Sequence, residues 1–270
     1  MLENPRSPRV RAVAKLTKRS ARAETGLFLL EGPQAVREAL AYRPDAIVEL
    51  FVTPNGWEKH PDLRAASAAH SVKVEHVTEY VLNAMADTVT PQGLVAVVRQ
   101  TPTSLRDIFA ESPRLIAICE EVRDPGNLGT IIRAADAAGA DAVILTGRTV
   151  DPYNPKVVRA TTGSLFHLPV SVGGTLEDVV ERAHAVGITV LAADVKGDDL
   201  LQARAEGVLA RPTAWLFGNE AWGLEESALA QADHVLKLPI FGRAESLNLA
   251  TAASVCLYES AFTQRAADGR

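Results

Sequence analysis

Residues 236–259 read LKLPIFGRAESLNLATAASVCLYE, and this stretch decides which fold the chain can adopt. A short apolar strand ends at Pro239, a loop carrying Gly242 follows, and Ser246 is a natural N-cap for a helix that starts there. Behind the cap, small and apolar residues recur at helical spacing: Leu247, Ala250, Ser254, Leu257 and Ala261. Asn248 is a poor helix former in the first turn. The pattern fits a capped helix packed on a sheet, and equally a ligand pocket built by a strand-end loop and a helix N-terminus around Ser246 and Asn248.

The composition indicates an ordinary soluble globular protein, with 270 residues, 47% of them hydrophobic and 23% charged. No apolar run is long enough for a membrane helix, and the N-terminus, MLENPRSPRV, lacks the apolar core of a signal peptide. We therefore expect a cytoplasmic protein with no membrane partner. Cys119 and Cys256 stand far apart with no Cys or His at ligand spacing, so we expect neither a disulfide nor a metal site.

The N-terminus concentrates positive charge, although the whole chain carries a formal net charge of −5. Val10, Val13, Ala14 and Leu16 are threaded among the basic residues, so from about Arg9 the pattern predicts one basic amphipathic helix. A solvated charged face is one explanation, and a patch that holds the phosphates of a nucleic acid is the other. The residues predicted to bind RNA here are Arg9, Arg11, Lys15, Lys18, Arg19 and Arg22.

Strand and helix patterns alternate along the chain with one linker-like break. Residues 26–98 predict a compact α/β unit without a cluster of catalytic residue types. The stretch Thr101-Pro102-Thr103-Ser104 is the break, and it divides the chain into domains of residues 1–103 and 104–270. From Leu115 a second alternation predicts a parallel sheet covered by helices. The helices expected there span residues 128–138, 155–159, 176–185 and 225–232.

Ligands of such sheets bind beyond the carboxyl ends of the strands, and three strand-end loops are unusual. The first, residues 123–133 (RDPGNLGTIIR), turns on Pro125 and Gly126 and places Arg133 inside the following helix. The second, residues 216–224 (LFGNEAWGL), brings two glycines and Glu220 to the end of an apolar strand. The third is the stretch quoted above. No G-x-G-x-x-G fingerprint follows a predicted strand, so the sequence does not support a Rossmann dinucleotide site or a class I methyltransferase site.

Taken together and in this order, the three loops resemble the signature motifs of the SpoU/TrmH branch of the SPOUT RNA methyltransferases. The matching segments are NLGTIIR, FGNEAWGL and LPIFGRAESLNLATA, all within residues 114–270. The N-terminal segments RVRAVAKLTKRS and FLLEGPQAVREAL resemble that family's substrate-binding domain, an α/β RNA-binding module of ribosomal-protein type. The resemblance therefore covers nearly the whole chain.

The resemblance implies a C-terminal SPOUT domain whose parallel sheet carries a deep trefoil knot, with the S-adenosylmethionine pocket formed by the knot. It also implies a homodimer with the first-loop helix and the C-terminal helix at the interface. The implied reaction is methyl transfer from S-adenosylmethionine to a ribose 2′-hydroxyl of RNA. Because the sulfonium donor already carries a good leaving group, the enzyme's tasks are in-line positioning and removal of the hydroxyl proton.

Carried over position by position, the resemblance assigns catalytic roles to Arg133, Glu220, Ser246 and Asn248, with Asn127 supporting the first loop. It assigns the cofactor to Leu216, Gly218, Leu238, Ile240 and Leu247. In the family the arginine at the position of Arg133 is often assigned as the base. Because a guanidinium is effectively always charged, gripping the adjacent phosphate and stabilising the developing alkoxide is the alternative, and the sequence leaves both open.

A further segment of the resemblance, residues 156–166 (KVVRATTGSLF), places Lys156 and Arg159 one turn apart on a helix. They are predicted to contact RNA phosphate near the active site, and a solvated helix face is the alternative. The separate N-terminal domain favours 23S ribosomal RNA as the substrate, and transfer RNA is the second candidate. From a different class, the chain could be a non-catalytic RNA-binding or ribosome assembly factor on the same fold.

Overall fold

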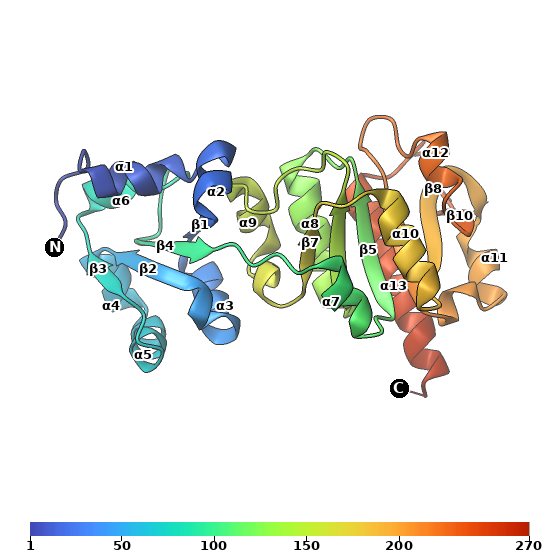
Figure 1. Ribbon diagram of the computed structural model, residues 1–270, viewed down its shortest axis with the longest axis horizontal. Coiled ribbons are helices and arrows are strands. Elements are labelled where there is room, and N and C mark those ends of the chain that lie inside the picture. The colour runs from blue at the N-terminus through green and yellow to red at the C-terminus, as the bar shows by residue number, and fades with distance from the viewer. Residues whose placement is uncertain (270) are drawn as a thin grey trace. The chain divides into compact units, whose positions relative to one another are not determined.

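The computed structural model describes residues 1–269, and their contacts group into two compact units. The first unit comprises Met1–Thr101 together with Asp151–His167. The second comprises Pro102–Val150 and the chain from Leu168 onward (Figure 1). The predicted division at residues 103 and 104 differs from this grouping in two respects: the break lies at residues 101 and 102, and residues 151–167 group with the first unit.

The first unit is built on a four-stranded mixed sheet in the order β1-β4-β2-β3. Strands β1 and β2 are antiparallel to β4, whereas β3 runs parallel to β2. The strands are β1 (Leu27–Glu31), β2 (Ile47–Val52), β3 (Val74–His76) and β4 (Leu94–Arg99). The helices are α1 (Pro8–Lys15), α2 (Arg19–Thr25), α3 (Pro33–Tyr42), α4 (Pro54–Lys59), α5 (Pro61–Ala69), α6 (Glu79–Met85) and α9 (Pro155–Thr161), with short 3-10 turns at Pro44–Ala46 and Ser164–Phe166.

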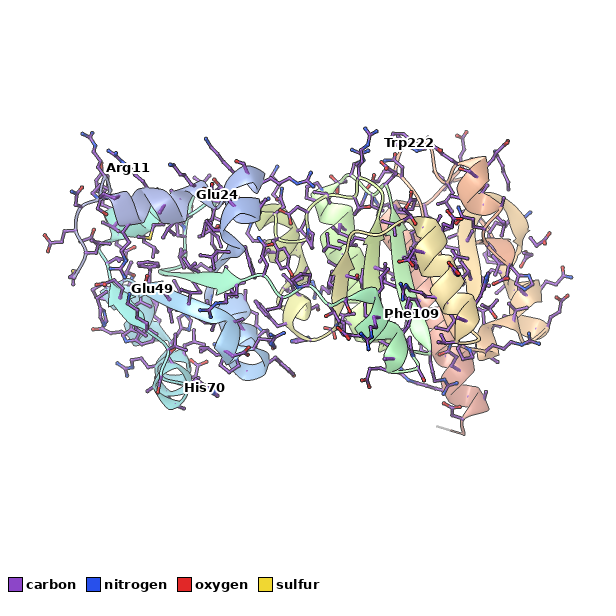
Figure 2. The ribbon with its side chains drawn as sticks, in the orientation of Figure 1. Arg11, Glu24, Glu49, His70, Phe109 and Trp222 are labelled. Atoms are coloured by element: carbon purple, nitrogen blue, oxygen red, sulfur yellow. The ribbon has the colours of Figure 1, made fainter. Side chains whose placement is uncertain are left out.

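The basic N-terminal segment forms two helices, α1 and α2, and not the single helix that its pattern predicted. Ser7 caps α1 by accepting from the backbone N–H of Val10. Val10 and Val13 lie three residues apart and so point to the same side, where they join a buried cluster that includes Phe51 and Leu82. The helix therefore packs on the sheet with its apolar residues and exposes Lys15 and Arg11, of which Arg11 is labelled in Figure 2.

Arg22 ties residues 151–167 to the rest of the first unit. Its side chain is almost completely buried, and its guanidinium lies 2.6 Å from a carboxylate oxygen of Asp151. It also donates hydrogen bonds of 2.9 Å to the carbonyl oxygens of Leu16 and Thr17. The ring of Tyr153 packs 4.9 Å from that of Phe28. A buried charge needs this full set of partners, so Asp151 is part of the first unit's core.

The second unit is a six-stranded sheet in the order β10-β8-β9-β5-β6-β7, parallel throughout, as the alternating pattern predicted. The strands are β5 (Leu115–Glu120), β6 (Ala142–Thr146), β7 (Val170–Val172), β8 (Thr189–Asp199), β9 (Thr213–Phe217) and β10 (His234–Lys237). The helices are α7 (Leu105–Ala110), α8 (Pro125–Ala138), α10 (Leu176–Ala185), α11 (Leu200–Ala205), α12 (Glu226–Leu229) and α13 (Leu249–Ala267), and Val208–Ala210 forms a 3-10 turn.

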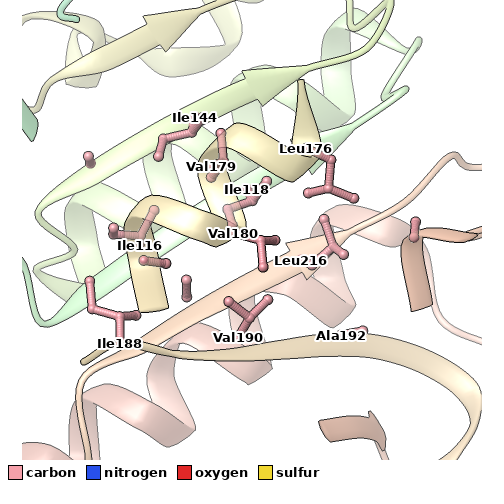
Figure 3. Packing of buried hydrophobic residues seen from close by; sticks show 14 of the residues in the cluster. Ile116, Ile118, Ile144, Leu176, Val179, Val180, Ile188, Val190, Ala192 and Leu216 are labelled. Carbon is pink, nitrogen blue, oxygen red and sulfur yellow. The ribbon is translucent and has the colours of Figure 1, made fainter. Parts of the chain in front are cut away.

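The sheet of the second unit separates two helical layers. On one face α7, α10 and α12 bury a cluster that contains Ile116, Ile118, Val190 and Leu216 (Figure 3). The alternate residues of the strands point to the opposite side, where Trp215 of β9 donates a 2.8 Å hydrogen bond to the Ser260 hydroxyl of α13. Helices α8 and α13 pack against each other on that side. The parallel α/β sheet with a smaller N-terminal α/β unit is thus confirmed, whereas the trefoil knot stays a prediction.

Within residues 1–269, every helix is too short or too polar to cross a bilayer. The same residues contain no group of three or more His, Cys, Asp or Glu side chains that could hold a metal ion.

Candidate active site at the carboxyl edge of the sheet

The candidate site lies where strands β5 and β9 end side by side. The chain leaves β5 toward β6 and β7 on one side, while β8 and β10 flank β9 on the other. The loops that follow β5 and β9 therefore diverge at this point, which is where open parallel sheets leave a crevice for ligands. The side chain of Asn219 joins the two loops by donating a 2.8 Å hydrogen bond to the carbonyl oxygen of Glu121.

Glu220 holds the first turn of α8 in place. Its two carboxylate oxygens accept from the backbone N–H groups of Arg123 at 3.1 Å and Asp124 at 3.0 Å. The side-chain amide of Asn127 donates to the same carboxylate at 3.3 Å. Asp124 in turn caps α8 by accepting from the backbone N–H of Asn127 at 2.8 Å. The carboxylate of Glu220 thus satisfies backbone donors that a helix start leaves open, and it orients Asn127.

Asn248, and not Ser246, is the N-cap of the C-terminal helix. Helix α13 begins at Leu249, and the side-chain oxygen of Asn248 accepts from the backbone N–H groups of Ala250 at 2.9 Å and Thr251 at 3.3 Å. The prediction of an N-cap at Ser246 was wrong because asparagine caps as well as serine does, and residues 238–248 are left as loop. The side-chain amide of Asn248 also donates to the side-chain oxygen of Asn127 at 2.9 Å.

The three loops therefore meet through a cluster of side-chain hydrogen bonds, which we call the three-loop cluster: Asn127, Glu220 and Asn248. Ser246 lies two residues before Asn248 on the exposed loop and makes no side-chain hydrogen bond within residues 1–269. Arg133 lies six residues beyond Asn127 on α8, on an exposed stripe with Gly126, Thr130 and Ala137. Within residues 1–269, the Arg133 side chain forms no hydrogen bond or ion pair with the three-loop cluster.

The loop from Leu238 to Leu247 is suited to hold a ligand. Within the described chain its backbone makes no hydrogen bond to other backbone groups, so its N–H and C=O groups are open to a ligand or to water. Several of its apolar side chains face solvent, with Phe241 88%, Leu247 41% and Ile240 38% exposed. Apolar walls with free backbone donors and acceptors fit a cofactor that carries an adenine ring and a charged amino-acid end.

Two predicted cofactor residues, Leu216 in β9 and Gly218 directly after it, have other structural roles. The side chain of Leu216 is fully buried in the core cluster, so only its backbone remains for a ligand. Gly218 is required by its own loop, because a Cβ atom there would lie 2.5 Å from the carbonyl carbon of Gly223. The backbones of Asn219 and Gly223 close that loop with two 2.9 Å hydrogen bonds. Asn219 is buried and joins the two loops, and it was not predicted as a site residue. The sequence feature that could have indicated it is its position directly after Gly218 at the end of a strand.

The predicted RNA-binding residues divide into free and paired side chains. The prediction for Arg22 was wrong, because its charge is buried against Asp151. Arg9 is paired with Glu49 and Glu75, and Arg159 lies 2.8 Å from Asp87. The others are exposed and form no ion pair within residues 1–269, and so remain candidates for RNA contacts: Arg11, Lys15, Lys18, Arg19 and Lys156.

Two buried thiols, Cys119 and Cys256, and one paired carboxylate, Glu121, have shifted pKa values in the second unit. Burial raises the pKa of Cys119 to about 12, and burial also raises the pKa of Cys256, so both thiols stay protonated at neutral pH. The pKa of Glu121 is lowered because its carboxylate accepts from the backbone N–H of Arg148 and lies beside Arg123. Glu121 therefore remains charged next to the candidate site.

Comparisons with known proteins agree on the class that this fold and site define, the SPOUT-type RNA methyltransferases. A family model described as the SpoU rRNA Methylase family matches residues 114–258, and one described as the MRM3-like substrate binding domain matches residues 7–96. The chain belongs to the SpoU rRNA methylase family.

Relatives and solved structures match along nearly the full length. An uncharacterized tRNA/rRNA methyltransferase of Synechocystis is 36% identical over 270 residues, with 98% of this chain and 95% of the relative covered. The 23S rRNA (guanosine(2553)-2′-O)-methyltransferase RlmP of Bacillus subtilis is 33% identical, with 95% and 97% covered. A crystal structure of an AdoMet-bound rRNA methyltransferase from Sinorhizobium meliloti superposes with a TM-score of 0.83 at 34% identity, covering 96% of each chain.

Proposed function

We propose that this protein transfers the methyl group of S-adenosylmethionine to a ribose 2′-hydroxyl of 23S ribosomal RNA. The observation that carries the proposal is the three-loop cluster, which joins the three family motifs by direct hydrogen bonds at the carboxyl edge of the sheet. The names of the relatives support the substrate, since RlmP and the matched Streptomyces viridochromogenes enzyme are named as 23S rRNA 2′-O-methyltransferases.

The cofactor would lie against the loop of residues 238–247, with Leu238, Ile240 and Leu247 along its apolar parts and the backbone around Gly218 beside it. The open N–H and C=O groups of the loop support this placement. When bound, S-adenosylmethionine supplies an electrophilic methyl group on a sulfonium. What this chain must add is the position of the 2′-hydroxyl and a place for its proton.

Glu220 and Asn127 act here as positioning residues. The Glu220 carboxylate already accepts from two backbone N–H groups and one amide, so it is committed to fixing the α8 start and is not a free base. Ser246, whose side chain makes no hydrogen bond within residues 1–269, is free to face the acceptor ribose from the loop. Asn248 positions that loop by capping α13.

Arg133 grips the phosphate next to the acceptor and stabilises the developing alkoxide. The side chain is exposed and has no ion-pair partner within residues 1–269, and a guanidinium binds an anion better than it removes a proton. Arg133→Ala should therefore reduce turnover far more than cofactor affinity. Arg133→Lys should restore part of the lost turnover, because it keeps the charge without the planar fork.

We further propose a homodimer formed through α13 and the exposed stripe of α8. Helix α13 leaves Val255 40% and Phe262 55% exposed, two full turns apart on one side of the helix. Those apolar side chains support burial against a second copy. Sedimentation should give a dimer for the native chain and a monomer for Phe262→Asp. The cytoplasm, where ribosomal RNA is accessible, is the proposed compartment.

The proposal is tested with purified protein, labelled S-adenosylmethionine, and total ribosomal and transfer RNA from a strain that lacks this gene. Label should appear on one ribose of 23S rRNA, located by fragment mapping. Label on transfer RNA would favour the second candidate substrate, and label on a base or on protein would contradict the ribose assignment. Calorimetry that detects no S-adenosylmethionine binding would favour a non-catalytic assembly factor.

A further inference from the structure

A pocket outside the three-loop cluster opens beside the loops that follow β5 and β9, and Glu121, Arg123 and Trp222 of these loops line it. It has a volume of about 390 Å³ and lies at the carboxyl ends of β5 and β6, beside the start of α10 and along α12. Its walls include Glu120, Arg148, Trp222 and Gln231. None of the residues assigned above to the cofactor or to catalysis lines it. The pocket is large enough for one nucleobase with its sugar.

Two acceptor atoms in this pocket are buried without a donor. The Oε2 atom of Glu120 and the Oε1 atom of Gln231 are each shielded from solvent, and neither has a hydrogen-bond partner within residues 1–269. Buried polar atoms in native proteins are almost always paired, so two unpaired acceptors that line one cavity indicate a missing donor. A ligand with at least two N–H groups on one edge would satisfy both.

The other residues that line the pocket indicate which further groups the ligand carries. Trp222 is 58% exposed and stands at the outer edge of the second unit (Figure 2), offering a flat aromatic face. Leu176, Leu224 and Ala228 supply apolar surface opposite the polar atoms. Arg148 is exposed and has no carboxylate within ion-pair distance in the described chain, whereas Arg123 is already paired with Glu121. A flat, N–H-rich ring carrying a phosphate matches all three features.

We propose that this pocket binds a guanine nucleotide of the RNA substrate, with the base on Trp222 and its Watson–Crick edge on Glu120 and Gln231. Guanine presents N1–H and the N2 amino group side by side, three donors on two atoms, which suits a carboxylate with a second acceptor nearby. Uracil presents a single N–H, and adenine and cytosine present their two N–H groups on one nitrogen, whereas guanine presents donors on two neighbouring nitrogens that can reach two separate acceptors. Arg148 would hold the phosphate.

The position of the pocket gives it a role in substrate selection. Trp222 is two residues from Glu220, in the loop that the Asn219–Gly223 hydrogen bonds close. Glu121 follows Glu120 and is held by Asn219. Because the same two loops line the pocket and carry Glu220, a guanine fixed in the pocket would fix the register of the RNA strand at the three-loop cluster. The inference rests on the proposed function for its RNA substrate.

Binding of 5′-GMP and 5′-IMP to the full-length protein, measured by calorimetry, tests the pocket directly. The two nucleotides differ only in the 2-amino group, so GMP should bind about tenfold more tightly. Glu120→Gln, which keeps the side-chain shape, should remove that preference, and Trp222→Ala should weaken both nucleotides while Trp222→Phe retains most of the binding. Glu226→Gln is the matched control, because that carboxylate is exposed on α12 and lies outside the pocket.

Methyl transfer to total ribosomal RNA gives the second readout. Glu120→Gln should lower kcat/KM through a raised KM for RNA, while the Kd for S-adenosylmethionine stays unchanged. Equal affinity for GMP and IMP, or a GMP preference that survives Glu120→Gln, would overturn the inference. If the native protein prefers GMP but methylates no RNA, the pocket stands and the proposed function fails. If it methylates RNA and all Glu120 and Trp222 variants match it, the proposed function stands and the pocket fails.

Discussion

Replacing Asn248 with alanine removes two kinds of contact from the second unit. The side-chain oxygen caps α13 by accepting from Ala250 and Thr251, and the amide donates to Asn127. Loss of an N-cap costs about 0.5–2 kcal/mol, and loss of one hydrogen bond about 0.5–1.5 kcal/mol. Because Asn248 is exposed, solvent replaces part of both contacts, and we take the lower half of the range, about 1.5 kcal/mol.

The assay is urea unfolding followed by the emission of Trp215, which is fully buried and hydrogen-bonded to Ser260 of α13, so it reports on the helix that Asn248 caps. With a denaturant slope of about 2 kcal/mol/M, Asn248→Ala should lower the midpoint by about 0.7 M. Asn248→Asp is the matched control. It keeps the capping oxygen and loses only the amide donor, so it should recover more than half of the loss.

Two results would refute this reasoning. A midpoint that Asn248→Ala leaves unchanged would mean that α13 starts without help from its cap. An Asn248→Asp protein as unstable as Asn248→Ala would mean that the capping oxygen is not what stabilises it. Combining Asn248→Ala with Asn127→Ala completes the test, because two residues joined by a hydrogen bond should give a combined loss smaller than the sum.

Three other perturbations have outcomes that the structure defines. Arg22→Ala should destabilise the first unit by about 3–5 kcal/mol in chemical unfolding, because Asp151 loses its buried partner, and exposed Arg19→Ala should cost almost nothing. Gly218→Ala should lower the urea midpoint measured through Trp215, since its Cβ would overlap the Gly223 backbone, whereas Gly242→Ala adds a methyl group to open space. Because the pKa of Cys119 is raised to about 12 in the folded protein, the thiol's contribution to the free energy of unfolding is fully present below about pH 9 and should be lost as the pH rises from about 9 to about 12. Cys119→Ala should therefore reduce the pH dependence of the free energy of unfolding in this range.

Local pattern predicted the second unit well because its elements follow simple periodicities. The run of β5 is buried at five successive positions, as a central parallel strand requires, and the helix pattern of residues 176–185 coincides with α10. Short helices such as α4, α7 and α11 were missed, since six residues carry too little periodicity to detect. The basic segment was predicted as one helix because nothing in Leu16-Thr17-Lys18 marks a break.

The sequence predicted which residues belong to the candidate site, but not which of them hydrogen-bond to one another. The motifs named Asn127, Glu220 and Asn248 without indicating that the three side chains hydrogen-bond to one another, since that depends on the strand order β8-β9-β5. Arg22 was misassigned because a charged residue in a basic run looks exposed until its partner is known, and that partner lies 129 residues away. Charge patterning along a sequence cannot reveal such a distant pairing.

The place of residues 151–167 in the first unit has a consequence for synthesis of the chain. The polypeptide passes between the two units at residues 101–102, 150–151 and 167–168, so neither unit is a single uninterrupted segment. During translation the first unit cannot complete its core until Asp151 and Tyr153 have left the ribosome. By then two strands of the other unit's sheet, β5 and β6, have been synthesised, and its remaining four strands have not. Folding of the first unit is therefore completed only while the second unit is being synthesised. Until Asp151 has emerged, the guanidinium of Arg22 has no counter-ion.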